Sequence, residues 1–188
     1  VIANPTFPVP PFERLTGISV RPIQNDVQLP RVHMWNASVQ QEFFTDWVAT
    51  VSYAGARGTH LWRNSDVNVP TPATLADGTL FYAAGLQRPN RNYSAIELKS
   101  SDGDSWYKAL IVEVKKRWSH GLQVQSSYTW SKSEDTTQNS TFFSDSTTAT
   151  TSAMPEFIPG YNKGLSDFHA EHNWVTNFVW EPFSGWRL

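Results

Sequence analysis

Apolar and polar side chains alternate along several stretches of this chain, which is the pattern of strands with one apolar and one polar face. From Trp35 to Phe43 the odd positions are apolar and the even positions polar, with Gln41 the one exception. The alternation resumes at Trp47 and continues to Tyr53. Helical spacing of apolar residues is almost absent along the chain. The pattern therefore predicts an all-β protein.

The same alternation predicts three further strands. Two long stretches are separated by Ser119-His120-Gly121, whose glycine suits the positive φ of a tight turn. Another stretch near the end of the chain carries three aromatic residues on one face, and a second tight turn is expected at 182–185. The predicted strands are 34–43, 47–55, 105–118, 122–133 and 172–181.

The connections between these strands alternate between short turns and long loops. The long loops are predicted at 56–104 and 134–171, and the stretch 133–153 is too rich in Ser and Thr to be buried. Residues 1–30 hold six of the twelve prolines and show no periodicity, so they are predicted to form an irregular loop ahead of a β-barrel segment over 31–188. Hairpins with short turns at one end and long loops at the other are typical of an outer-membrane β-barrel wall.

The tryptophans favour a membrane wall over the alternative, a soluble β-sandwich. Seven of the nine lie on the apolar face of their own strand. Those at the loop end are Trp35, Trp106, Trp130 and Trp174, and those at the turn end are Trp47, Trp118 and Trp180. Two such rings match the aromatic girdles at the two membrane–water interfaces, whereas a sandwich would scatter indoles through its core. We expect an antiparallel meander of hairpins within a transmembrane barrel, with short periplasmic turns and long extracellular loops.

Composition narrows the class of protein further. A net charge of −2 provides no basic field for nucleic acid. The absence of cysteine excludes disulfides, thiol catalysis and cysteine-ligated zinc. No apolar run is long enough for a transmembrane helix, and no signal-peptide pattern opens the chain. The first residue, Val1, suggests a chain that begins within a longer protein or after processing.

Motifs for covalent chemistry are missing from the sequence. No nucleophile elbow, phosphate-binding loop, HExxH or GxGxxG motif occurs, so we expect neither catalytic residues, nor enzymatic activity, nor a cofactor. The one metal-like cluster contains His169 and His172, but it enters a strand, where side chains three apart point to opposite faces. A structural role is favoured there, and no metal site is predicted. The acids Asp102 and Asp104 are interpreted as solvated turn residues.

Two sets of residues are candidates for ligand contact. The polar, lumen-facing row of Glu113, Lys115 and Arg117 either lines a solute path or forms a charge ladder with neighbouring strands, and the ladder is favoured. Aromatic residues in the long loops either capture a ligand or pack the loops together. These loop aromatics are Trp62, Phe81, Tyr82, Tyr93, Phe142, Phe143, Phe157 and Tyr161.

Five short sequence motifs occur in order over about residues 26–185. They are 30–43 (PRVHMWNASVQQEF), 53–64 (YAGARGTHLWRN) with 67–70 (VNVP), 105–117 with 119–122 (SHGL), 127–133 (SYTWSKS), and 164–169 (GLSDFH) with His172 and 181–185 (EPFSG). In this order they resemble TonB-dependent outer-membrane receptors, specifically the Oar-like group with a carboxypeptidase-regulatory-like N-terminal domain. Each motif alone is weak, and the shared order makes the resemblance specific.

The resemblance implies a barrel of about 22 strands around a plug domain. This chain would then be a segment without the plug, the TonB box or the terminal strand. It would lie in the outer membrane of a Gram-negative bacterium and contribute to ligand capture and uptake without covalent chemistry. The implied partners are outer-membrane lipid, the plug and TonB through parts not present here, and an unknown small ligand or glycan, but no nucleic acid. The alternative is a free-standing soluble or self-assembling extracellular β-protein, with glycan binding as one such activity.

Overall fold

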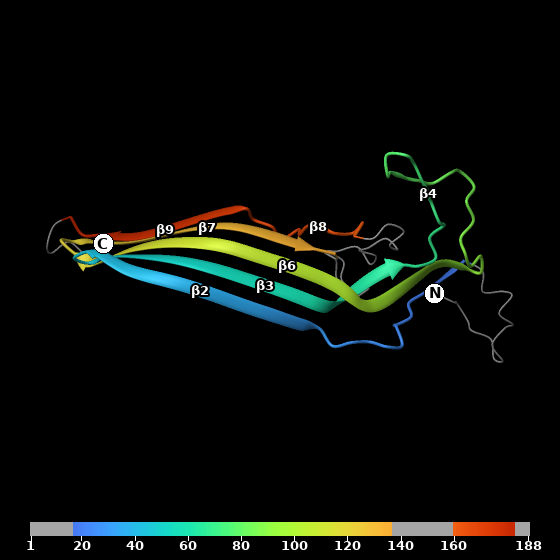
Figure 1. Cartoon of the computed structure of the whole chain (residues 1–188), viewed down its shortest axis with the longest axis horizontal. Helices are drawn as coiled ribbons and strands as arrows, with labels where there is room; N and C mark the ends of the chain where they lie inside the picture. The colour runs from blue at the N-terminus through green and yellow to red at the C-terminus, as the bar shows by residue number, and fades with distance from the viewer. Residues whose placement is uncertain (1–16, 137–159, 183–188) are drawn as a thin grey trace. The chain divides into compact units, whose positions relative to one another are not determined.

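The computed structural model describes residues 17–136 and 160–182 of the chain. These residues form only strands, turns and irregular segments, so the prediction of an all-β fold is confirmed (Figure 1). No helix among them is long and apolar enough to cross a membrane. The strands are β1 Ile18–Val20, β2 Arg31–Phe44, β3 Trp47–Asp66, β4 Ala73–Thr74, β5 Leu80–Phe81, β6 Tyr93–Ser119, β7 Leu122–Asp135, β8 Gly164–Leu165 and β9 His172–Trp180.

The chain divides into two compact units. The first, called here the loop unit, comprises Val1–Leu29, Trp62–Gly103 and Thr137–Asn162, and the second, the sheet unit, comprises Pro30–Leu61, Asp104–Thr136 and Lys163–Leu188. In the sheet unit the order of hydrogen-bonded strands is β2-β3-β6-β7, and β8 and β9 both pair with β7. Figure 1 shows these strands running side by side. The pairs β2–β3, β6–β7 and β7–β9 are antiparallel, as a meander of hairpins requires.

Short turns close the hairpins of the sheet unit. At the β6–β7 turn, φ is +52° at His120 and +71° at Gly121, which is the backbone that two-residue hairpin turns use. A side chain at Gly121 would also collide with the carbonyl oxygen of Glu181, so glycine is required there on two grounds. The β2–β3 turn has φ of +71° at Asp46. Of the tight turn predicted at 182–185, all but Pro182 lies outside the described residues.

The register places the alternating side chains on two distinct faces, because directly opposed residues in an antiparallel pair share a face. One face, called here the apolar face, carries large apolar and aromatic side chains on every paired strand. Its opposed pairs include Trp35–Gly55, Val39–Val51, Leu110–Trp130, Val112–Tyr128, Tyr128–Trp174, Val124–Phe178 and Leu122–Trp180. The other face, called here the polar face, includes the pairs Ser38–Ser52, Gln40–Thr50, Glu113–Ser127, Lys115–Gln125, Gln125–Asn177 and Thr129–Asn173.

The sheet unit has almost no hydrophobic core. Among the described residues, Val48 and Ala109 are the apolar residues that are fully buried. Large apolar side chains on the apolar face stay open instead, with Val39 and Trp174 each 74% exposed. A contiguous apolar surface of this kind is unfavourable in water and suits contact with lipid. The polar face is not uniformly polar, since Met34 lies on it at 80% exposure.

Two strands are longer than the alternation predicts. The predicted strand 47–55 continues as β3 to Asp66, and the predicted strand 105–118 begins as β6 at Tyr93, so both take residues from the predicted loop 56–104. The added segments contain apolar residues, such as Leu61, Ile96 and Leu98, but no sustained alternation of apolar and polar positions. With these segments, β3 and β6 are each longer than the roughly 9–11 residues with which a tilted strand crosses a bilayer. The same loop contains the β4–β5 hairpin, and β1, inside the segment predicted to be irregular, pairs in parallel with β6.

Candidate functional site

The lumen-facing row forms a charge network on the polar face. The Lys115 ammonium lies 3.0 Å from the Glu113 carboxylate, which also accepts a 2.7 Å hydrogen bond from the Gln125 amide. The Arg117 guanidinium lies 3.7 Å from the carboxylate of Glu42 on β2. The structure therefore brings the three predicted residues into a ladder of opposite charges. All of these side chains retain solvent contact, so they can also meet a polar solute.

A buried asparagine organises the loop unit. Asn68 is 1% exposed, and its amide nitrogen donates to the carbonyl oxygens of Asn90 (2.9 Å) and Tyr93 (3.0 Å). Its side-chain oxygen accepts from the Asn90 N–H at 2.8 Å. Three hydrogen bonds from one side chain thus tie the start of the long connection to its end. Sequence reasoning missed Asn68, and the one local signal was the Asp66-x-Asn68 spacing typical of an Asx turn.

Asp66 completes this anchor. Its carboxylate accepts hydrogen bonds from the N–H groups of Asn68 and Ile96, each at 2.9 Å, and from the Arg88 guanidinium at 2.8 Å. Burial by itself raises the pKa of Asp66, but the bonds from Ile96, Arg88 and Asn68 outweigh it and hold the pKa below its ordinary value. The carboxylate is therefore ionised, and it fixes the loop base rather than acting as an acid.

Ion pairs reinforce the loop unit elsewhere. The Arg21 guanidinium donates to Glu97 at 2.7 Å, and Arg63, which is 7% exposed, forms a two-point pair with Asp102. The Asp102 carboxylate also accepts a bond from the Ser100 hydroxyl. Asp102, interpreted from the sequence as a solvated turn residue, is thus one half of a hydrogen-bonded ion pair.

The loop aromatics are only partly brought together. Partial desolvation, and then the charge of Tyr161, raise the pKa of Tyr82. Both remain well exposed, as does Phe81 in β5. Trp62 lies towards the end of β3 and Tyr93 is the first residue of β6. Phe142, Phe143 and Phe157 lie outside the described residues.

The two histidines of the metal-like cluster have separate partners. His172 bonds the Tyr128 hydroxyl through Nδ1 at 2.8 Å, and its Nε2 lies 3.8 Å from Glu171. His169 Nδ1 accepts the Ser133 N–H at 3.3 Å. In the described part of the chain, no three His, Asp or Glu side chains gather as a metal site would need. The histidines tie the entry of β9 to β7.

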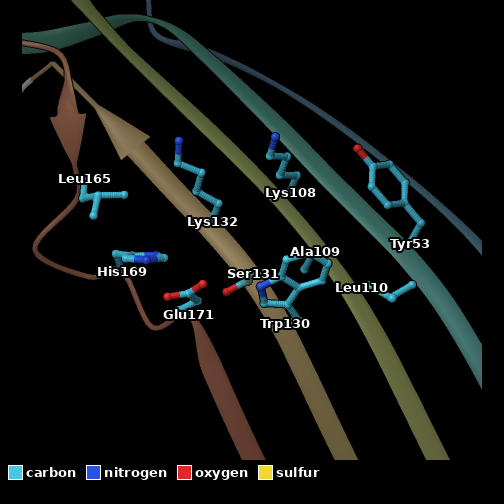
Figure 2. Close-up of a pocket in the computed structure, with 10 residues that line it drawn as sticks. All are labelled: Tyr53, Lys108, Ala109, Leu110, Trp130, Ser131, Lys132, Leu165, His169 and Glu171. Atoms are coloured by element: carbon cyan, nitrogen blue, oxygen red, sulfur yellow. The ribbon is translucent and has the colours of Figure 1, made fainter.

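A hollow of about 510 Å³ opens in the sheet unit beside the middle of β6 and the loop end of β7. Figure 2 shows Lys108 and Lys132 extending in the same direction, with Trp130 among the other lining residues. A second hollow of about 210 Å³ shares three of the lining residues and adds six others, which are Trp35, Ala56, Arg57, Trp106, Tyr107 and Glu134. The shared residues are Tyr53, Lys108 and Lys132. Sequence reasoning missed these lysines because they interrupt the apolar face on two separate strands.

Comparison with known proteins agrees with this architecture. The sequence matches the family described as outer membrane beta barrel domain over residues 2–186, which is nearly the whole chain. No curated protein and no solved structure matches it. The family accounts for an open antiparallel sheet whose apolar face is exposed in the described part of the chain. The chain therefore lies in the outer membrane and belongs to the outer membrane beta barrel domain family.

Proposed function

We propose that this chain is part of the barrel wall of a TonB-dependent receptor, which captures a ligand in its extracellular loops and takes it up without covalent chemistry. The observation that carries the proposal is the loop unit. The strands β3 and β6 continue past the length needed to cross a bilayer, and a buried polar anchor at Asn68 holds the connection between them. An extracellular loop ordered in this way suits ligand recognition.

Three further features support the same role. Membership of an outer-membrane barrel family supports a transport-type function. The polar face carries the charge ladder of Glu113, Lys115 and Arg117, which suits a wet barrel interior. The ordered motifs along the sequence are similar to those of Oar-like receptors, which supports a receptor with a plug and TonB coupling in the complete protein.

The first test is the size, location and coupling of the native protein. An antibody raised against residues 133–153 would be used to blot fractionated cells, and to recover the protein after cross-linking in living cells. A band several times 21.3 kDa in the outer membrane, with TonB cross-linked to it, is the expected result. A large outer-membrane band without cross-linked TonB would agree with an outer-membrane barrel but would contradict the proposal of a TonB-dependent receptor. A 21 kDa soluble or extracellular band would favour self-assembly or glycan binding instead.

A further inference from the structure

Two lysines lie directly opposite each other on the apolar face of the sheet unit. Lys108 of β6 and Lys132 of β7 are cross-strand partners in the hairpin register. Like charges in directly opposed positions repel each other and destabilise a sheet. The Glu134 carboxylate, 2.9 Å from the Lys132 ammonium, compensates one of the two charges. No carboxylate in the described part of the chain forms a direct ion pair with Lys108, and Glu134 attracts it at longer range.

Further cations gather around the same position. Lys163 and Arg57 both pack over the ring of Trp106, with the charged groups 4.3 Å and 4.1 Å from its centroid. Asp104 holds the Arg57 guanidinium at 2.8 Å. Four cationic side chains, Lys108, Lys132, Lys163 and Arg57, thus face three carboxylates, those of Glu134, Asp104 and Glu171. The cluster carries a surplus of positive charge that an anion would relieve.

The position of the cluster along the strands indicates which anion. The hairpin turn at 120–121 lies about 12 residues along β6 from Lys108, roughly one bilayer crossing, so the cluster lies at the membrane surface away from the turns, which faces the cell exterior in barrels of this kind. Towards the turns, the same face continues with Leu110, Trp130, Val112 and Tyr128, which suit acyl chains. A molecule that fits both parts has a phosphorylated head and hydrocarbon tails.

The hollow lined by the two lysines offers room for more than a bare phosphate. It is about 510 Å³ in volume, and its edge includes the phenol of Tyr53, the imidazole of His169 and the carboxylate of Glu171 (Figure 2). Glu171 can accept hydrogen bonds from sugar hydroxyls. We propose that this cluster binds the phosphorylated sugar headgroup of an outer-leaflet glycolipid, with its acyl chains along the apolar face below. This proposal depends on the outer-membrane location and not on the receptor function.

The test uses the complete protein that carries this chain, purified from outer membranes in detergent. Its binding of a diphosphorylated glycolipid of the lipid A type would be measured by native mass spectrometry. The comparisons are the same lipid after removal of its phosphates and inorganic phosphate alone. The double substitution Lys108→Gln with Lys132→Gln is expected to weaken binding about thirtyfold, from the usual contribution of two lysines near an anionic surface. Removal of the phosphates is expected to weaken it similarly.

Two control variants make the result specific. Lys115→Gln with Arg117→Gln removes the same number of charges from β6 but away from the cluster, and should leave glycolipid binding within about twofold, since screening limits long-range charge effects. Lys108→Arg with Lys132→Arg keeps both charges and should retain the lipid. Equal binding by wild type and the glutamine variant would overturn the proposal, as would equal binding of the dephosphorylated lipid. Inorganic phosphate displacing the lipid completely at millimolar concentration would indicate a simple anion site and would also overturn it.

If a variant fails to fold, the salt dependence of lipid binding by the wild-type protein provides a second test. Wild-type protein alone must lose the phosphorylated glycolipid progressively as salt rises, while its affinity for the dephosphorylated lipid stays level. Salt-independent binding of both lipids would overturn an electrostatic headgroup site. Either outcome leaves the coupling to TonB untouched, because that is tested by cross-linking in cells.

Discussion

The indole of Trp35 on β2 lies over the backbone of Gly55, its directly opposed partner on β3. A side chain at position 55 would collide with the Cε2, Nε1 and Cζ2 atoms of that ring. An aromatic residue that covers a glycine in this way compensates for the missing side chain of the glycine on the sheet surface. The pair lies at the loop end of the apolar face, where an amphipathic indole suits the membrane–water interface.

Replacing Gly55 by alanine should therefore displace the Trp35 ring and lower stability by about 1–3 kcal/mol, as overpacking usually does. Urea unfolding of the complete barrel, followed by tryptophan fluorescence, would measure the effect. Gly164→Ala is the matched control, because nothing lies within 4 Å of a side chain there. Equal stability of the two variants would show that the indole does not rest on Gly55 in the membrane.

Adjacent positions on β6 should respond very differently to a charge. Val112 lies on the apolar face opposite Tyr128, and Ile111 lies on the polar face opposite Thr129. Val112→Arg should cost about 2–4 kcal/mol if it reaches the bilayer midplane, whereas Ile111→Arg should be tolerated because the lumen is wet. Folding into lipid vesicles, followed by urea titration, would compare them. A larger cost at Ile111 would mean that the two faces are assigned the wrong way round.

Loss of the Asn68 amide should loosen the loop unit without unfolding the barrel. Asn68→Leu keeps the approximate volume but leaves the Tyr93 carbonyl and the Asn90 N–H without their Asn68 partner, at roughly 1–3 kcal/mol for each buried group, while the Asn90 carbonyl keeps a 3.4 Å bond from the Tyr93 N–H. We expect faster proteolytic cleavage within residues 69–89 of the folded, detergent-solubilised protein. Gln87→Ala, which removes one exposed local bond to Gly85, is the control. Unchanged cleavage in Asn68→Leu would exclude Asn68 as the anchor.

The loop unit should also loosen in acid. Because the folded-state pKa of Asp66 lies below its ordinary value of 3.8, the carboxylate contributes stability above pH 3.8 that is lost as the pH falls through its folded pKa. Hydrogen exchange at the Asn68 and Ile96 amides should therefore show constant protection from pH 7 to about 5 and lose it below about 3.8. Asp66→Asn should remove this pH dependence. If Asp66→Asn still lost hydrogen-exchange protection in acid, the pH dependence would have to come from another titrating group.

Some strands and contacts of this chain could be predicted from the sequence, and others could not. The β6–β7 hairpin was predictable, because Leu110, Val112 and Val114 alternate with polar neighbours and His120-Gly121 marks the turn. The far parts of β3 and β6 were not, because residues 93–104 show no apolar periodicity and their strand conformation depends on hydrogen bonds to partners distant in sequence. The candidate lumen row could be named from one strand, but its contact between Arg117 and Glu42 joins two strands that are far apart along the chain.

The sequence by itself determined that the chain is made of strands with two chemically different faces. Side chains leave a strand on alternate sides, so the order of residues sets which of them share a face. Only the tertiary structure decided that Lys108 opposes Lys132, that Arg57 and Lys163 meet at Trp106, and that Asn68 ties Asn90 to Tyr93. These relationships depend on register and on the close approach of distant segments, and local periodicity carries no information about either.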